Sequence, residues 1–250
     1  MRICLITGAS SGMGKEFVKL AMQGREKYDE IWVIARRKDR LDHWPRLYKD
    51  QSFRILALDL GKEDQLKLLH EELNEVQPQI DLMIHCAGFG IMGQISEIPP
   101  SEQMEMVDVN CRTVAGLTSI LLPFMAEGSG MIYLASAAAF LPQPDFAVYA
   151  ASKSFVLSYV RALRREVKNR NIRVTAVCPG AVKTEFFNRA ARQRHLPAYK
   201  KLVMADPEKV VKKALEDCRR NREISVYGKL MKLFHLAAKI LPHRVILHFL

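Results

Sequence analysis

One tyrosine and one lysine in this chain have the spacing of an acid–base pair. Tyr149 and Lys153 are four positions apart in the stretch 147–169, whose pattern predicts a helix, so their side chains share one face. A free tyrosine has a pKa of about 10 and is a poor acid or base at neutral pH. Because a nearby ammonium group favours the phenolate, we expect Lys153 to lower the pKa of Tyr149 and permit proton exchange with a substrate oxygen.

Ser136 adds a second polar group suited to the same chemistry. It ends the strand-like segment 130–136, and its hydroxyl can donate a hydrogen bond to the oxygen on which Tyr149 acts. The alternative is that Tyr149 and Lys153 only decorate an exposed helix face, since their spacing alone often arises by chance. The motifs around the pair favour catalysis.

A glycine-rich turn near the start of the chain predicts a phosphate-binding site. It joins an apolar segment, 2–7, to a segment with helical spacing of apolar residues, 12–24. Glycines let the backbone approach a ligand, and the N-terminus of the next helix offers free N–H groups and a positive dipole end to a pyrophosphate. The residues expected to bind there are Gly8, Ser10, Ser11, Gly12, Met13 and Gly14.

These motifs resemble those of the short-chain dehydrogenase/reductase family over nearly the whole chain. The resemblance is carried by Thr7-Gly-x-x-x-Gly-x-Gly14, His85-Cys86-Ala87-Gly88, Ser136 with Tyr149-x-x-x-Lys153, and Pro179-Gly180. It implies hydride transfer between a nicotinamide and a carbonyl or alcohol, with Tyr149 as general acid or base. It further implies that Lys153 holds the nicotinamide ribose, and that Asn110 anchors a water linking Lys153 to a proton relay. The implied catalytic set is Asn110, Ser136, Tyr149 and Lys153.

The resemblance also implies contacts with the rest of the cofactor. Asp59 matches the family's adenine-contacting aspartate, although an aspartate at a strand end can equally cap the following helix. The other expected contacts are Leu60, Ala87, Gly88, Asn110, Tyr149, Lys153, Pro179, Gly180, Val182 and Thr184.

One block departs from the family pattern. The family usually carries Asn-Asn-Ala-Gly where this chain has His85-Cys86-Ala87-Gly88, so we expect different local hydrogen bonds there. Ala87 and Gly88 still allow close passage over the cofactor. Because no Cys/His cluster with metal spacing surrounds His85, we expect a packed loop histidine rather than a catalytic base or a ligand, and no metal.

Charge after the second predicted strand indicates which cofactor is preferred. Folds that prefer NAD usually place an acidic residue there for the ribose 2′-hydroxyl, whereas this chain has Arg36-Arg37-Lys38. An arginine can grip a 2′-phosphate with its planar fork of donors. We therefore expect NADP(H) rather than NAD(H), with Arg36 as the leading contact and Arg37 as the second. The alternative is that this run merely solvates the start of a helix.

Composition limits the class of protein. With 250 residues, 49% of them hydrophobic, the chain can bury a full single-domain core. Its five cysteines have no paired or metal-like spacing, which is typical of a reducing compartment. The first strand begins right after Met1, and no apolar stretch reaches the length of a spanning helix. We therefore expect a cytoplasmic protein.

A net charge of +11 is compatible with nucleic acid, an anionic membrane, or an anionic cofactor and substrate. No helix-turn-helix, zinc or aromatic RNA-reading motif is present, so we expect no nucleic-acid partner. Much of the excess is expected to be general surface charge and attraction for NADP(H).

Strand and helix patterns alternate along the chain. This alternation predicts one α/β domain over 1–250, a Rossmann-like, doubly wound parallel sheet with helices on both faces and ligands at the carboxyl ends of the strands. The predicted strands are 2–7, 30–35, 53–58, 80–85, 130–135 and 171–177. The predicted helices are 12–24, 38–50, 62–76, 101–126 and 147–169.

Two C-terminal segments bear on substrate and partners. By resemblance, 181–205 forms a substrate lid, and the apolar and cationic residues of 185–203 suit a hydrophobic substrate with an anionic group; the alternative is a plain surface helix. The tail 228–250 is apolar and basic, with a helix predicted up to Pro242 and a stripe formed by Lys229, Lys232, His235 and Lys239. It can wall the substrate pocket, bury in an oligomer, or lie on an anionic membrane.

The sequence thus predicts an NADP(H)-dependent reductase or dehydrogenase acting on a small-molecule carbonyl or secondary alcohol. By resemblance, the helix 147–169 suggests a homodimer or homotetramer. The alternatives are a cofactor-sensing or membrane-associated interaction protein on the same fold, and an epimerase or dehydratase variant.

Overall fold

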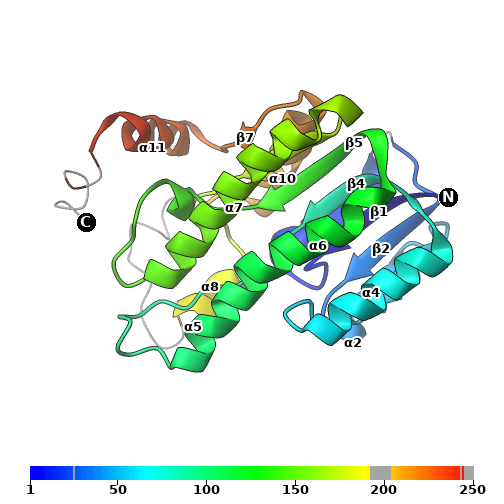
Figure 1. Cartoon of the computed structure of the whole chain (residues 1–250), viewed down its shortest axis with the longest axis horizontal. Helices are drawn as coiled ribbons and strands as arrows, with labels where there is room; N and C mark the ends of the chain where they lie inside the picture. The colour runs from blue at the N-terminus through cyan, green and yellow to red at the C-terminus, as the bar shows by residue number, and fades with distance from the viewer. Residues whose placement is uncertain (25, 192–203, 243, 245–250) are drawn as a thin grey trace.

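The alternating pattern produces one parallel sheet. The computed structural model describes residues 1–24, 26–191, 204–242 and 244 (Figure 1). Within them, seven parallel strands pair in the order β3-β2-β1-β4-β5-β6-β7. The strands are β1 (Arg2–Thr7), β2 (Glu30–Ile34), β3 (Phe53–Leu56), β4 (Gln79–His85), β5 (Met125–Leu134), β6 (Arg173–Val177) and β7 (Ile224–Ser225).

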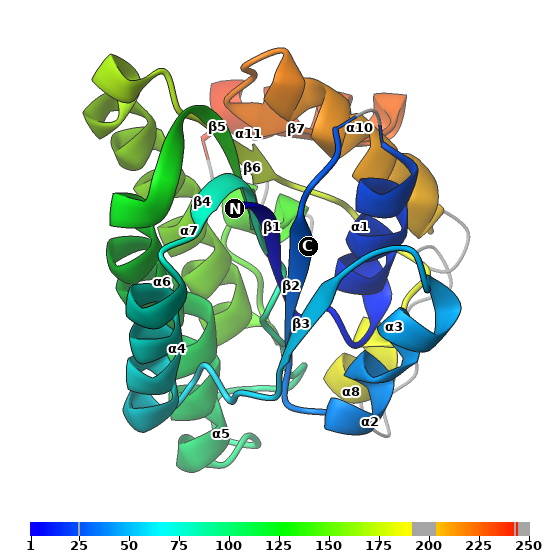
Figure 2. The same cartoon turned by 90° about the vertical axis from the view of Figure 1, so that its right-hand side faces the viewer.

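Helices cover both faces of this sheet (Figure 2). One face carries α4 (Glu63–Val76), α6 (Thr113–Leu121) and α7 (Ala147–Glu166); the other carries α1 (Gly12–Gln23), α2 (Lys38–Leu41), α3 (His43–Leu47) and α10 (Pro207–Arg219). Leu69, Leu117 and Val160 belong to one buried cluster, whereas Phe17 and Val211 belong to the other. The predicted doubly wound single domain is confirmed.

The sheet has a switch point between its two central strands. From β1 the chain proceeds outward to β2 and β3, then returns to β4 on the other side and continues to β7. Thr7 and His85, the last residues of β1 and β4, are register partners. In open α/β sheets the crevice beside such a point binds ligands.

Several element boundaries differ from the prediction. The single helix expected over 38–50 is two short helices, α2 and α3, because the ring of Pro45 would clash with the carbonyl of Leu41 in a continuous helix. Strand β5 begins at Met125 rather than at residue 130. Helix α10 and strand β7 were not predicted, although Asp206 before Pro207 is a typical helix start: its carboxylate accepts from the N–H groups of Glu208 and Lys209.

The helix expected over 101–126 is irregular at one functional position. It consists of α5 (Pro100–Val107), a π-helical turn over Asp108–Arg112, α6 and a 3-10 turn over Leu122–Phe124. The π turn contains Asn110, and such turns often occur at functional sites. The C-terminal segment predicted to be helical is α11 (Lys229–Ile240).

The glycine-rich turn packs too tightly for any side chain at two positions. A Cβ atom on Gly14 would lie 2.2 Å from the carbonyl oxygen of Gly8, and one on Gly8 would lie 2.8 Å from the backbone nitrogen of Ala87. Gly8 also has a φ of +68°, which favours glycine. The turn is therefore held directly against the loop that follows β4.

This packing predicts that Gly14→Ala lowers the free energy of unfolding by about 1–3 kcal/mol, because the methyl group must displace backbone. Urea unfolding measures the effect. Gly116→Ala, in α6, is the matched control: its Cβ would lie an ordinary 3.4 Å from Leu66, so helix propensity should leave that variant unchanged or stabilise it by up to about 1 kcal/mol. Equal stability of the Gly14 variant and the wild type would contradict this account of the turn.

Candidate active site

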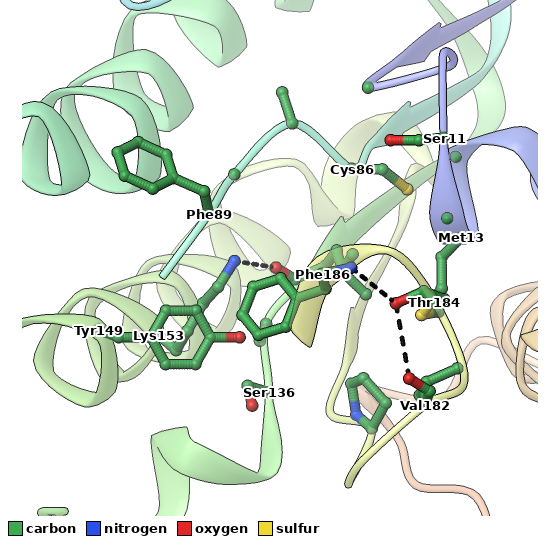
Figure 3. A pocket seen from close by; sticks show the side chains of 18 of the residues that line it. Ser11, Met13, Cys86, Phe89, Ser136, Tyr149, Lys153, Val182, Thr184 and Phe186 are labelled. Carbon is green, nitrogen blue, oxygen red and sulfur yellow. Dashed lines mark hydrogen bonds between the residues drawn. The ribbon is translucent and has the colours of Figure 1, made fainter. Parts of the chain in front are cut away.

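The structure brings three of the four predicted catalytic side chains together at the carboxyl end of the sheet (Figure 3). Tyr149 and Lys153 project from the first turns of α7, and Ser136 follows β5. The Ser136 oxygen accepts a hydrogen bond of 3.1 Å from the N–H of Ala138. The side chains of Ser136 and Tyr149 are close enough to interact, and this interaction lowers the pKa of the phenol. Ser136 is thus placed to orient an oxygen beside the phenol.

Tyr149 is almost completely buried. Burial raises its pKa to about 12, against the smaller lowering effect of Ser136. The ring is 7% exposed and lies between Phe146, with 4.2 Å between ring centroids, and Phe186, at 5.4 Å. The pKa of Tyr149 is therefore not lowered as expected, because desolvation outweighs the other influences on it.

Lys153 is itself a buried cation. Its Nζ lies 5.7 Å from the centroid of the Tyr149 ring and donates a 2.8 Å hydrogen bond to the carbonyl of Leu134. Burial lowers its pKa from 10.5 to about 8. Lys153 is therefore charged at neutral pH but much closer to losing its proton than an exposed lysine.

Asn110 does not line the cavity with the other three. Its amide nitrogen donates to the carbonyl of Phe89 at 2.8 Å and to the Ser152 hydroxyl at 3.0 Å, while its side-chain oxygen accepts from the N–H of Phe89 at 3.1 Å. Both N–H donors of the amide are thus used. A water held by Asn110, as the resemblance implies, has to bind to one of its oxygens.

His85 is a packed histidine at the end of β4 rather than in a loop. The hydroxyl oxygen of Thr7 accepts from the N–H groups of Cys86 and Ala87 at 3.2 Å, so its hydrogen is left to donate to Nδ1 of His85 at 3.0 Å. That assignment places the ring proton on Nε2, which has no partner among the described residues. Burial, reinforced by the charge of Lys153, lowers the pKa of His85 to about 3.

A cavity of about 820 Å³ joins this cluster to the glycine-rich turn. The cavity is large enough for a dinucleotide's reactive end and a substrate. Apart from Asn110, every residue predicted to contact the cofactor lines it. Those lining residues are Gly8, Ser10, Ser11, Gly12, Met13, Gly14, Arg36, Arg37, Asp59, Leu60, Ala87, Gly88, Tyr149, Lys153, Pro179, Gly180, Val182 and Thr184.

Two arginines mark one end of the cavity. Arg37 donates to the Ser10 hydroxyl at 3.2 Å, whereas Arg36 pairs with Glu105 at 3.5 Å. Glu185, which also lines the cavity, pairs with Arg37 and with Arg40, the latter at 2.8 Å. The sequence reasoning missed Arg40 and Glu185 because they are 145 positions apart in the chain and no motif links them.

The carboxylate of Asp59 faces the cavity instead of capping a helix. It accepts from the N–H of Gly61 at 3.2 Å, and α4 begins later, with Lys62 as its N-cap residue. The capping alternative for Asp59 is therefore wrong. At the N-terminus of α1 the Ser11 side chain makes no capping bond, so the first N–H groups of that helix are left for a ligand.

The opposite end of the cavity is apolar, and most of its lining was not predicted from motifs. Phe146 and Phe186 flank Tyr149, and helix α11 contributes Leu230, Met231 and Phe234. Of the predicted substrate segment 185–203, residues 192–203 lie outside the described residues. The cationic residues of its proposed rim are Arg189, Arg192, Arg194, Lys200 and Lys201. All of them except Arg189, which belongs to helix α8 (Phe186–Ala191), lie in that part.

The neutral, buried state of His85 predicts acid sensitivity. Between pH 6.5 and about 3 the unfolded chain binds a proton that the folded protein does not, so stability falls as the pH falls through this window. His85→Asn removes that titration. We expect the wild type to lose about 3 kcal/mol more unfolding free energy than this variant between pH 7 and pH 4, measured in urea. His70→Asn, at an exposed position of α4, should follow the wild type, and equal losses in all three proteins would contradict the prediction.

Comparison with known proteins agrees with this geometry. A family model described as short chain dehydrogenase matches residues 2–195. An uncharacterised oxidoreductase of Staphylococcus saprophyticus is 35% identical over 188 residues, which cover 74% of this chain and 75% of the relative. Sulfoacetaldehyde reductase 2 of Chromohalobacter salexigens is 30% identical over 195 residues, 74% of each protein.

Solved structures share the fold. A short-chain dehydrogenase from Sphingobium yanoikuyae, in complex with NADPH, matches with a TM-score of 0.80 at 23% identity and covers 100% of this chain and 96% of that one. A Burkholderia phymatum short chain dehydrogenase/reductase in complex with NAD matches with a TM-score of 0.79 at 20% identity, over 95% and 93% of the two chains. This chain is therefore an oxidoreductase of the short-chain dehydrogenase family, as the match over residues 2–195 shows, in agreement with the cluster at Tyr149 and the glycine-rich turn.

Proposed function

We propose that the protein is an NADP(H)-dependent reductase or dehydrogenase that interconverts a carbonyl and a secondary alcohol. The observation that carries the proposal is the continuity of one cavity, which runs from an anion-binding turn and two arginines to Tyr149, Ser136 and Lys153. A dinucleotide requires the first end, and proton transfer to a substrate oxygen requires the second.

The residues present fit a nicotinamide dinucleotide. Gly8 and Gly14 have no side chains that could cover the N-terminus of α1, and the close contacts at both positions leave no room for one. The first N–H groups of α1 have no side-chain cap, so they would bind the pyrophosphate. Arg36 and Arg37 line the same cavity and carry the forked donors that suit a 2′-phosphate. NADPH in the Sphingobium yanoikuyae protein supports the choice, although the Burkholderia phymatum protein holds NAD.

The chemistry is divided between cofactor and side chains. The nicotinamide ring, when bound, supplies the hydride to the carbonyl carbon or accepts it from the alcohol. In the reductive direction Tyr149 donates its proton to the carbonyl oxygen, which Ser136 orients by hydrogen bonding. The raised pKa of Tyr149 keeps the phenol protonated at neutral pH, which supports its role as proton donor. Lys153, beside the ring, stabilises the phenolate that remains.

The lining beyond Tyr149 supports a hydrophobic substrate. Phe146, Phe186, Met231 and Phe234 contribute large apolar surfaces there, and Gln143 is a polar residue of the same lining. Apolar pockets with few polar groups bind apolar ligands and orient them through those groups. Residues 181–205, of which Val182, Thr184 and Phe186 line the cavity, are proposed to form the lid over this substrate.

Removal of the phenolic hydroxyl tests the role of Tyr149. Tyr149→Phe is expected to lower kcat by about 10²–10⁴-fold and to leave the NADPH dissociation constant near that of the wild type, because only the proton donor is lost. The measurement is NADPH oxidation against a panel of apolar carbonyl compounds, with cofactor fluorescence titration beside it. Tyr159→Phe, on the same helix, should keep full activity. Wild-type turnover by the Tyr149 variant would rule out the proposed mechanism.

Cofactor preference tests the two arginines. Arg36→Ala and Arg37→Ala are each expected to weaken NADPH binding by about tenfold or more while changing NADH binding little, because only NADPH has the charged 2′-phosphate that they would contact. Fluorescence titration with both cofactors gives the ratio. Arg46→Ala, an exposed arginine on α3 outside the cavity, is the control. Equal weakening of both cofactors would remove that arginine as a phosphate contact.

A further inference from the structure

Helix α11 has two apolar faces, and among the described residues only one of them packs against the rest of the chain. Met231 and Phe234 line the cavity, and His235 stacks on Phe140 with 4.3 Å between ring centroids. Met231 also covers Gly180, where a Cβ would lie 2.5 Å from its sulfur. The inner face thus docks α11 onto the domain, at the edge of the molecule (Figure 1). Of the predicted basic stripe, Lys229, Lys232 and Lys239 are exposed, whereas His235 is half-buried against Phe140.

The outer face of α11 is large, apolar and exposed. Its leucines and isoleucine are 53–71% exposed, and their spacing places them on one side of the helix. They are Leu230, Leu233, Leu236 and Ile240, which we call the outer patch. Contiguous exposed apolar side chains of this kind mark interaction surfaces.

Charge around the outer patch identifies the partner. Lys229, Lys232 and Lys239 are exposed on the same helix, and the sequence from residue 224 to 250 contains no aspartate or glutamate. A second copy of this chain would bring the lysines of both helices together without a carboxylate on either α11 to pair with them. A surface with anionic head groups and an apolar interior matches both the apolar outer patch and the lysines around it. The leucines would insert into the apolar layer, and the lysine side chains would extend to the anionic head groups.

We propose that the outer patch docks the protein onto the surface of an anionic phospholipid bilayer. No helix among the described residues is long and apolar enough to cross a membrane, and α11 has 12 residues, so the helix would lie in the plane of the interface. Leu230 belongs to the patch and also lines the cavity. A hydrophobic substrate dissolved in the bilayer would then enter beside α11, a consequence that rests on the proposed reductase function.

The test is co-sedimentation of the full chain with vesicles of phosphatidylcholine alone or mixed with phosphatidylglycerol. We expect at least about tenfold tighter binding to the anionic vesicles, since three lysines each contribute about fivefold near such a surface, and a loss of binding as salt is raised. Leu233→Gln combined with Leu236→Gln should lower this binding about tenfold or more. Neither residue lines the cavity, so NADPH titration and thermal unfolding should match those of the wild type.

The control replaces exposed apolar residues elsewhere: Leu68→Gln on α4 combined with Met104→Gln on α5 should bind vesicles as the wild type does. Equal binding to neutral and anionic vesicles, or by wild type and outer-patch variant, would overturn the proposal. So would a patch-dependent dimer in sedimentation velocity without vesicle binding, which would assign the patch to a second copy. Because the readout is vesicle binding, failure here and failure of the reductase activity are separate results.

Discussion

A network of hydrogen bonds at the carboxyl ends of β1 and β4 connects the loop against which the glycine-rich turn packs to helix α7, which carries Tyr149 and Lys153. The Thr7 hydroxyl holds the N–H groups of Cys86 and Ala87, and the loop they begin is held in turn by Asn110, which grips the peptide groups of Phe89. Asn110 then donates to Ser152, whose hydroxyl donates to the carbonyl of Tyr149 at 2.7 Å. The position of the tyrosine relative to the turn is therefore fixed by buried, satisfied polar groups, which is how a site keeps its geometry before a ligand arrives.

Burial of Tyr149 and Lys153 also determines their pKa values. It raises the pKa of Tyr149 to about 12 and lowers that of Lys153 to about 8, so each group is pushed toward its neutral form. At neutral pH the Tyr149 phenol is therefore protonated and the neighbouring Lys153 ammonium is charged. This pair is suited to donating the phenol proton to a carbonyl oxygen. The arrangement is more consistent with a tyrosine that acts as an acid in reduction than with one ionised in advance.

The fold and the motif residues that line the site could be predicted from the sequence, because both depend on local patterns. The glycine spacing, Tyr149-x-x-x-Lys153 and the strand ends were sufficient to indicate which residues meet at the cavity. The pKa of Tyr149 was not predictable, because it depends on Phe146 and Phe186, which pack against the ring only in the folded chain. The pair of Arg40 with Glu185 is likewise a contact between distant segments. A place for the tail in the cavity wall was one of three alternatives, and only the folded chain shows that α11 lines the cavity.

Transfer of an isotope from the cofactor to the product distinguishes direct hydride transfer from every other route to the alcohol. The protein would be incubated with NADPH carrying deuterium at both hydrogen positions of the reactive carbon of its nicotinamide, together with apolar aldehydes and ketones, and the alcohols would be analysed by mass spectrometry and NMR. The account predicts one deuterium on the carbinol carbon of the preferred product, and a hydroxyl proton from solvent. Alcohol formed without deuterium at that carbon would contradict direct hydride transfer in the cavity beside Tyr149.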